Sequence, residues 1–141
     1  MVLDASVILK WFMREDDSDK AMSLKDEHCI GKFNIVVPDI LLYEVGNALR
    51  YEPEFSSKEI KLCLKELYEL NLNIIAPLPH ILHLIPDIAY HYDITFYDAS
   101  YISLAQNLGT QFVTADEKLY NKVNRLSFVN LLSKINLPLN F

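Results

Sequence analysis

Four acidic residues stand beside apolar stretches of the sequence: Asp4, Glu44, Asp98 and Asp116. Carboxylates in partly apolar surroundings repel one another and take up protons unless a cation lies among them. Their oxygen atoms suit hard divalent ions such as Mg²⁺ and Mn²⁺. If the fold brings these four side chains together, the chemistry that they predict is the binding of Mg²⁺ or Mn²⁺.

Each of the three aspartates also has a purely structural interpretation. Aspartate is a favoured N-cap residue, and a carboxylate is stabilised at the amino end of a helix. Taken singly, each aspartate is therefore more often a helix cap than a metal ligand. Glu44 is different, because on a helical wheel it borders the apolar stripe of Leu41, Val45 and Ala48. Ionised side chains are rarely buried without a partner, so Glu44 favours a bound cation.

The elements that must position these acids alternate between strand and helix. Short apolar runs bounded by turn residues predict strands at 1–3, 34–37, 72–76, 111–114 and 127–132. A period near 3.6 residues predicts helices at 7–12, 19–29, 39–52, 56–71, 97–108 and 117–123. This alternation predicts an α/β fold with a mainly parallel sheet. A length of 141 residues fits a single domain over residues 1–141.

The segment 77–92 is less regular. Its three prolines and three histidines among apolar residues predict one or two short helices separated by turns. His80 and His83 have H-x-x-H spacing, but the absence of a nearby cysteine disfavours a zinc site. The aromatic residues in and after this segment are interpreted as core or interface residues: Tyr90, Tyr92, Phe96, Tyr97 and Tyr101.

The predicted elements place the acids at one edge of the sheet. In an open parallel sheet, ligands bind beyond the carboxyl ends of the strands. Asp4 ends the first strand, Asp116 lies just past the fourth, and Glu44 sits about a turn and a half into the helix that leaves the second. Asp98 opens the helix before the fourth strand, and it reaches this edge if the connection is right-handed.

The net charge of −6 argues against a broad basic face that grips nucleic acid, because phosphate contacts dominate such affinity. Divalent ions held among acids reverse the local charge that a substrate phosphate meets, so the objection weakens at a metal site. The basic residues expected near the acids are few, with Lys10, Arg14 and Arg50 as candidates.

Several other classes of protein lack their usual sequence features here. No apolar run approaches the roughly 20 residues that cross a bilayer, and the amino terminus lacks the pattern of a signal peptide. We therefore expect a cytoplasmic protein without membrane association. Cys29 and Cys63 stand apart from other metal ligands, which predicts reduced thiols. The G-x-G-x-x-G, Walker and G-x-S-x-G motifs are absent, which disfavours dinucleotide binding, nucleotide hydrolysis and serine hydrolases.

Four segments resemble the PIN domain, and within it the VapC-like toxin ribonucleases of bacterial and archaeal toxin–antitoxin pairs. The segments are 2–6 (VLDAS), 42–49 (LYEVGNAL), 97–101 (YDASY) and 112–119 (FVTADEKL). Each segment is short, and their order and spacing along nearly the whole chain carry the resemblance. It implies a three-layer α/β/α sandwich around a five-stranded, mainly parallel sheet.

The resemblance also implies roles for individual residues. The four acids occupy the metal-binding and catalytic positions of the family, with Asp4 and Asp98 as direct or shared ligands. Ser6 and Thr114 match polar positions that line the pocket. Asn47 lies one turn beyond Glu44, where it either orients a carboxylate, touches substrate or is simply exposed.

In that family, one or two Mg²⁺ or Mn²⁺ ions activate a water for in-line attack on an RNA phosphodiester, leaving a 5′ phosphate. The expected partners are thus an RNA substrate, an antitoxin and a second copy of the chain, with Trp11, Phe12 and 77–92 as apolar surface for a homodimer. The alternative is an inactive PIN-fold module that binds RNA or protein. A receiver-like signalling domain is disfavoured, because paired acids near the first strand are absent.

Overall fold

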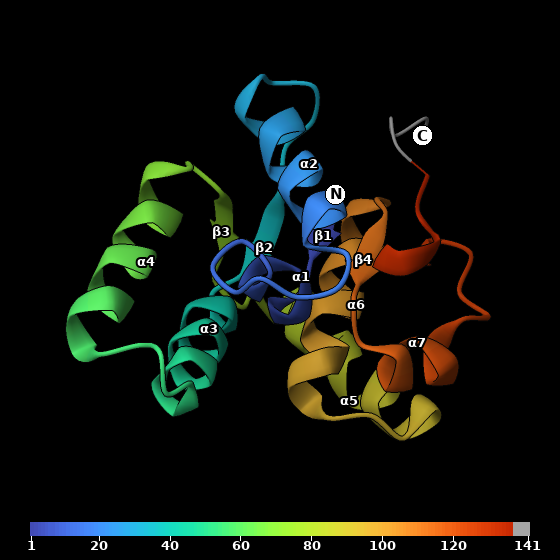
Figure 1. Cartoon of the computed structure of the whole chain (residues 1–141). Helices are drawn as coiled ribbons and strands as arrows, with labels where there is room; N and C mark the ends of the chain where they lie inside the picture. Colours follow the sequence, from blue (N-terminus) through green and yellow to red (C-terminus); the bar gives the residue numbers. More distant parts are fainter. Residues whose placement is uncertain (137–141) are drawn as a thin grey trace.

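Residues 1–136 of the computed structural model form a three-layer α/β/α fold around one sheet (Figure 1). Within these residues the sheet has five strands, all parallel, in the order β3-β2-β1-β4-β5. The strands are β1 (Val2–Leu3), β2 (Val36–Pro38), β3 (Asn73–Ile75), β4 (Phe112–Thr114) and β5 (Val129–Leu131). The predicted fold class is confirmed, and residues 137–141 of the predicted single domain lie outside the described part.

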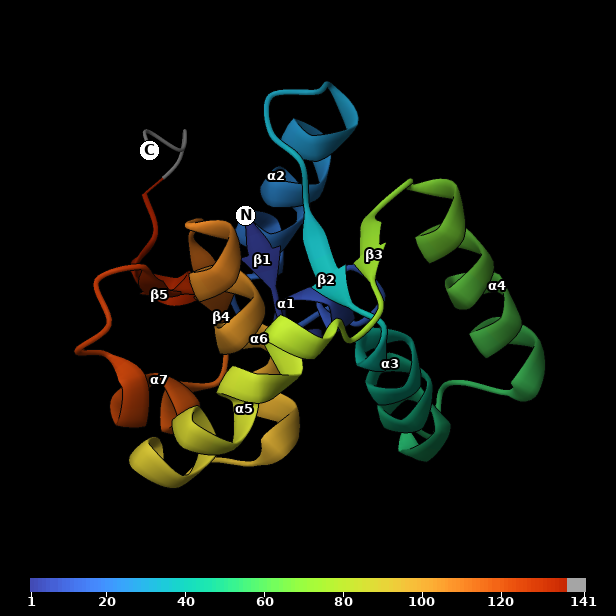
Figure 2. The same ribbon diagram turned by 180° about the vertical axis from the view of Figure 1, so that it is seen from behind.

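The helices connect these strands. They are α1 (Ala5–Leu9), α2 (Ser18–Cys29), α3 (Ile40–Tyr51), α4 (Ser57–Glu69), α5 (Pro79–Tyr92), α6 (Phe96–Leu108) and α7 (Glu117–Val123), followed by the 3₁₀ helix η1 (Leu132–Lys134). Helix α1 lies on one face of the sheet and contacts α3, whereas α6 crosses β1, β2 and β4 on the other face beneath α5 (Figure 2). The central strand is thus covered on both sides, and both of its residues are fully buried.

Local sequence signals explain where most helices begin and end. Ser56 and Glu59 form a reciprocal capping box that starts α4, in which the backbone amide of Ser56 donates to the Glu59 carboxylate over 2.8 Å. Gly109 ends α6 with a φ of 59°, a conformation that glycine adopts without the strain of a side chain. These boundaries agree with the predicted helices.

The prediction for 77–92 is wrong in one respect, because this segment is a single helix, α5. Pro79 occupies its first turn, where the missing amide proton is not needed. Pro86 lies inside the helix on its exposed side, while Ile81, Ile85 and Ile88 form a buried stripe. Packing of this stripe, with α5 against α6, outweighs the local preference of Pro86 to end the helix.

The first predicted helix is shorter than expected, because α1 ends at Leu9. The chain then turns tightly, with the Trp11 amide donating to Ile8 O over 3.0 Å. The Trp11 side chain is buried, and its Nε1 donates to Ala21 O over 2.8 Å. Trp11 therefore belongs to the core and offers no surface to a partner.

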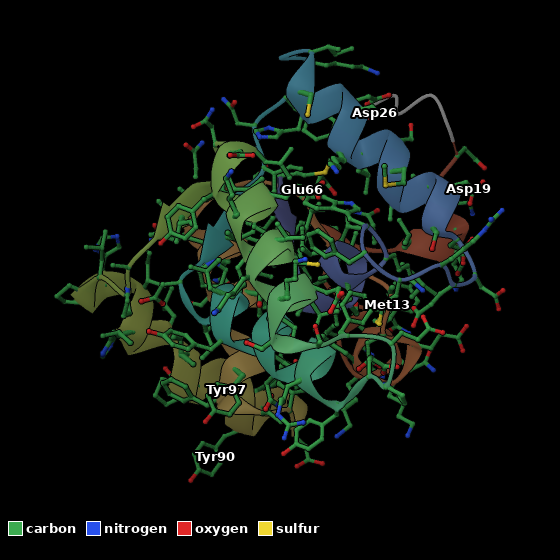
Figure 3. The ribbon with its side chains drawn as sticks, turned by 60° about the vertical axis from the view of Figure 1, so that its left-hand side comes forward. Met13, Asp19, Asp26, Glu66, Tyr90 and Tyr97 are labelled. Atoms are coloured by element: carbon green, nitrogen blue, oxygen red, sulfur yellow. The ribbon has the colours of Figure 1, made fainter. Side chains whose placement is uncertain are left out.

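The aromatic residues around α5 and α6 separate into two groups. Tyr101 is 1% exposed, whereas Tyr90 and Tyr97 are 90% and 57% exposed and project from the surface (Figure 3). The interpretation of all of them as core or interface residues therefore holds for the core only at Tyr101 and the half-buried Tyr92. Across residues 1–136, no helix has the length and apolar character that crossing a membrane requires.

We expect Pro86→Ala to increase the free energy of unfolding by about 1 to 2 kcal/mol. Proline in a helix interior costs about 3 kcal/mol, and it recovers less than this by reducing the conformational entropy of the unfolded chain. Urea denaturation measures the change. Asp87→Ala, at the neighbouring exposed position, serves as a control with little expected effect. An unchanged or lower value would show that α6 packs against a bend that Pro86 creates.

Candidate functional site

Asp4 lies at the end of the central strand and is 5% exposed. Its side chain accepts hydrogen bonds from Ser6 Oγ over 2.5 Å and from the Val7 amide over 3.3 Å, which makes it the N-cap of α1. Burial raises the pKa of Asp4 to about 7, against the opposing hydrogen bonds from Ser6 and Thr114, and the charge of Asp98 raises it further. Asp4 is thus a helix cap and also, among residues 1–136, a carboxylate whose pKa no neighbouring positive charge lowers.

Ser6 and Thr114 connect Asp4 to the end of β4. Ser6 Oγ accepts a hydrogen bond from the Ala115 amide over 2.8 Å and lies 3.4 Å from Thr114 Oγ1. Thr114 Oγ1 in turn accepts from the Asp116 amide over 3.0 Å. Two hydroxyl groups therefore fix the start of α1 against the start of α7, and both stand beside the predicted acids.

Asp116 and Asp98 differ in how their side chains are used. Asp116 is exposed and caps α7, accepting from the amides of Lys118 and Leu119 over 2.8 and 3.0 Å. Asp98 was expected to open α6, but Thr95 is the cap, and its hydroxyl accepts from the Asp98 amide over 3.0 Å. Because Thr95 satisfies the helix end, the half-buried Asp98 carboxylate does not act as the cap.

Glu44 is half-buried on α3 and accepts a hydrogen bond from Tyr101 Oη over 2.5 Å. Burial raises the pKa of Glu44, the bond from Tyr101 lowers it, and the charge of Asp98 raises it again. Burial and the charge of Glu44 also raise the pKa of Tyr101. The phenol therefore stays protonated and acts as the hydrogen-bond donor to Glu44. Asn47, on the same helix, is exposed and has no hydrogen bond to these acids within residues 1–136.

Asp98 interacts electrostatically with each of the other three acids. Its charge raises the pKa of Asp4 and of Glu44, and its own pKa is raised first by burial and also by the charge of Asp116. Asp98 therefore lies within range of the charges of the other three acids at this edge of the sheet. These effects do not by themselves bring Asp4, Glu44 and Asp116 close to one another.

Two lysines near this edge were absent from the sequence prediction. Lys118 and Lys122 line a small cavity of about 160 Å³ together with Asp98 and Asp116. Lys122 Nζ lies 3.2 Å from the Asp93 carboxylate, and its charge lowers the pKa of Asp98. Their position one turn apart on α7, directly after an acid that was singled out, is the signal that could have identified them.

The donor set agrees in its chemistry with Mg²⁺ or Mn²⁺, since it consists of oxygen atoms whose charges repel one another. In the described part of the chain, however, no three His, Cys, Asp or Glu side chains converge tightly enough to surround an ion. Residues suited to hold a metal are thus gathered at one edge, and their role as ligands stays a prediction.

The family of the chain follows from comparison with known proteins. The model of the PIN domain matches residues 1–125. The chain belongs to the PIN-domain family. A search of curated proteins found no match.

Solved structures share the fold of this PIN domain. PAE2754 from Pyrobaculum aerophilum is 23% identical with a TM-score of 0.67, covering 94% of this chain and 90% of that chain. A toxin–antitoxin complex from Klebsiella pneumoniae is 14% identical with a TM-score of 0.70, covering 93% of this chain and 96% of that chain. FitAB bound to an IR36 DNA fragment is 12% identical with a TM-score of 0.73, covering 96% of each chain. At these identities, the likeness concerns the fold.

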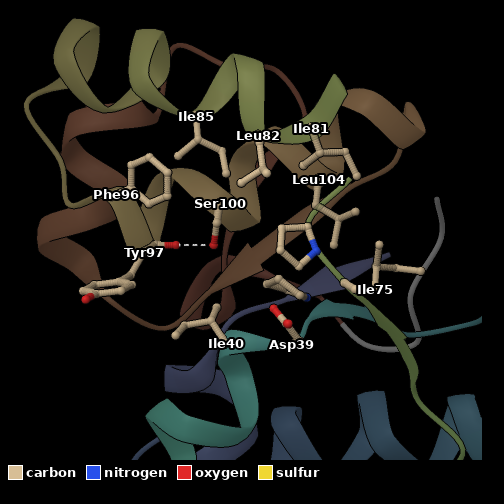
Figure 4. A pocket seen from close by; sticks show the side chains of 13 residues that line it. Asp39, Ile40, Ile75, Ile81, Leu82, Ile85, Phe96, Tyr97, Ser100 and Leu104 are labelled. Carbon is tan, nitrogen blue, oxygen red and sulfur yellow. Dashed lines mark hydrogen bonds between the residues drawn. The ribbon is translucent and has the colours of Figure 1, made fainter. Parts of the chain in front are cut away.

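A second cavity of this PIN domain is apolar, and it is lined by none of the four acids (Figure 4). Its volume is about 160 Å³, and helices α5 and α6 close it against the ends of β2 and β3. Ile75, Ile81 and Leu104 supply part of its apolar wall. Tyr97 also lines it and precedes Asp98, so an apolar surface and an acidic surface adjoin on α6.

We expect the metal-free protein to lose stability as the pH rises from about 4 to about 7. Over this interval folded Asp4 holds a proton that the unfolded chain has released, so the free energy of unfolding falls with pH. The raised pKa values of Glu44 and Asp98 act in the same direction. The fall should amount to a few kcal/mol, since one pKa unit corresponds to about 1.4 kcal/mol.

Chemical denaturation between pH 4 and 8 in the presence of chelator measures this slope. Asp4→Asn should flatten it, and added Mn²⁺ should restore stability at pH 8. Asp87→Asn removes the same charge from an exposed position on α5 and should keep the parent slope. An equal slope in the parent and in Asp4→Asn would contradict the raised pKa of Asp4.

Proposed function

We propose that this PIN domain is a metal-dependent endoribonuclease that hydrolyses RNA phosphodiester bonds, and that it is the toxin of a toxin–antitoxin pair. The observation that carries the proposal is the set of four carboxylates coupled through Asp98 at the carboxyl edge of a parallel sheet. Repulsion within this set is relieved by a divalent cation. Asp4 and Asp98 are assigned as direct ligands, and Glu44 and Asp116 complete the site.

The chain supports this chemistry by holding and orienting its acids. When bound, Mg²⁺ or Mn²⁺ supplies charge that lowers the pKa of water and neutralises the departing oxygen of a phosphodiester. Ser6 fixes one oxygen of Asp4, and Tyr101 fixes one oxygen of Glu44. Asp116 is exposed and therefore stands on the side from which a long polymer approaches.

Among the basic residues expected near the acids, Lys10 is not available to RNA. Lys10 is 12% exposed in its side chain and lies 3.0 Å from Glu15, so it is occupied within the protein. Lys118 and Lys122 stand beside Asp98 and Asp116 instead. Lys122 is bonded to Asp93 in the same way as Lys10 is to Glu15. We therefore assign Lys118 to the phosphates that flank the cleaved bond, because local positive charge offsets the acidic net charge of the chain.

An antitoxin and a second copy of the chain are the proposed protein partners. The Klebsiella pneumoniae neighbour is a toxin–antitoxin complex, and it shares the fold over 93% of this chain. Exposed apolar residues on and before α5, among them Leu78, Leu82 and Tyr90, offer surface for a homodimer. The mass in solution, measured by light scattering, tests the dimer.

A second candidate is an inactive PIN-fold module that binds RNA or protein. It is favoured by the spread of the acids, since no three of them surround an ion within residues 1–136. It predicts binding without metal-dependent cleavage. The two candidates therefore differ in one measurable reaction.

We expect purified protein to cleave members of a structured RNA panel in Mn²⁺ or Mg²⁺, and to lose this activity in chelator. Asp4→Asn and Asp98→Asn should each lower the rate at least about a hundredfold, because even residues behind direct ligands contribute about 10- to 100-fold. Asp87→Asn is the matched control and should keep the parent rate.

Product ends test the same reaction, since hydrolysis by metal-activated water should leave 5′ phosphates. Cleavage that persists in Asp4→Asn and Asp98→Asn at the parent rate would contradict the assigned roles. Well-folded protein that cleaves no RNA in either metal would favour the binding module.

A further inference from the structure

The bond between Tyr101 and Glu44 joins helices from the two faces of the sheet at the acidic edge. Tyr101 lies on α6 and Glu44 on α3, 57 positions apart in sequence. The tyrosine ring is buried and stacks on Phe112 of β4, with 6.3 Å between ring centroids. The ring thus belongs to the core, while the hydroxyl reaches the site.

The Tyr101 hydroxyl is placed to hold Glu44 against repulsion from Asp98. Asp98 precedes Tyr101 by one turn of α6, and its charge acts on Glu44. Like charges repel, and a glutamate side chain has several rotatable bonds, so Glu44 would turn away from Asp98 without an anchor. The Tyr101 hydroxyl is the only hydrogen-bond donor to the Glu44 carboxylate within residues 1–136.

We propose that Tyr101 is a positioning residue of the metal centre, whose hydroxyl holds Glu44 beside Asp98 in the orientation that receives Mg²⁺ or Mn²⁺. The bond uses Glu44 Oε2, so Oε1 would remain available to an ion. Hydrogen bonds from groups behind the ligands commonly set ligand orientation at metal sites. This inference rests on the proposed function, because it requires the four acids to hold an ion.

Tyr101→Phe removes the hydroxyl and retains the stacked ring. Mn²⁺ is titrated without RNA, and its binding is measured by the rise in melting temperature and by calorimetry. We expect Tyr101→Phe to raise the half-saturating Mn²⁺ concentration about 10- to 100-fold, the usual effect of residues behind direct ligands. RNA cleavage should show the same shift in Mn²⁺ dependence and return to near the parent rate at saturating Mn²⁺.

Ser103→Ala is the matched control on the same helix. Ser103 Oγ is buried and donates to Ile81 O over 2.8 Å, away from the acids, so this variant also loses one buried hydroxyl bond. Its melting temperature should fall while its half-saturating Mn²⁺ concentration matches that of the parent. A general loss of stability is thereby separated from a change at the metal centre.

A double-mutant cycle tests whether Tyr101 acts through Glu44. Tyr101→Phe should add no further change in Mn²⁺ affinity to a Glu44→Ala protein. The proposal is overturned by an equal loss in both backgrounds, by parent-like Mn²⁺ binding in Tyr101→Phe, or by failure of Tyr101→Phe to fold while Ser103→Ala folds. If the parent cleaves RNA with Mn²⁺ and Tyr101→Phe has the same Mn²⁺ dependence, only this inference is contradicted. If the parent shows no response to Mn²⁺, the proposed function is contradicted as well.

Discussion

The burial of the Asp4 carboxylate at the end of the central strand is the constraint on which the site depends. β1 lies between β2 and β4, so its carboxyl end opens into the middle of the sheet edge. A buried carboxylate is unstable as an anion unless hydrogen bonds or a cation compensate it. Ser6 and Val7 supply the hydrogen bonds, and these bonds fix where α1 begins. A proton or a cation must supply the remaining compensation.

The parallel sheet explains why acids that are distant in sequence share this edge. Every strand presents its carboxyl end on the same side, so Asp4 and Asp116 follow neighbouring strands at one edge as soon as β1 pairs with β4. Asp98 returns to the edge because α5 and α6 carry the chain across the opposite face before β4. This edge could be predicted from the sequence by the alternation of elements. The distances between carboxylates could not, because they depend on how helices from both faces pack.

Predictions from sequence succeeded where local signals and tertiary packing agree, as at the Ser56 capping box and at Gly109. They failed at Pro86, where burial of an isoleucine stripe against α6 outweighs the local effect of proline. Asp98 was expected to open its helix, which was predicted to begin at 97, but Thr95, three residues earlier, is the cap. At Pro86 the deciding contact, with α6, lies outside the window that a local pattern covers.

The partner of Glu44 was beyond sequence reasoning for the same reason. A tyrosine on an apolar helix face is predicted to be a core residue, and the ring of Tyr101 is indeed buried in the core against Phe112. Its hydroxyl acts 57 positions away on a helix of the opposite layer. The relative placement of Glu44 and Asp98 therefore depends on how α3 and α6 pack across the sheet edge. A change in the core that shifts either helix alters the spacing of the acids, so the stability of the fold and the geometry of the site are physically coupled.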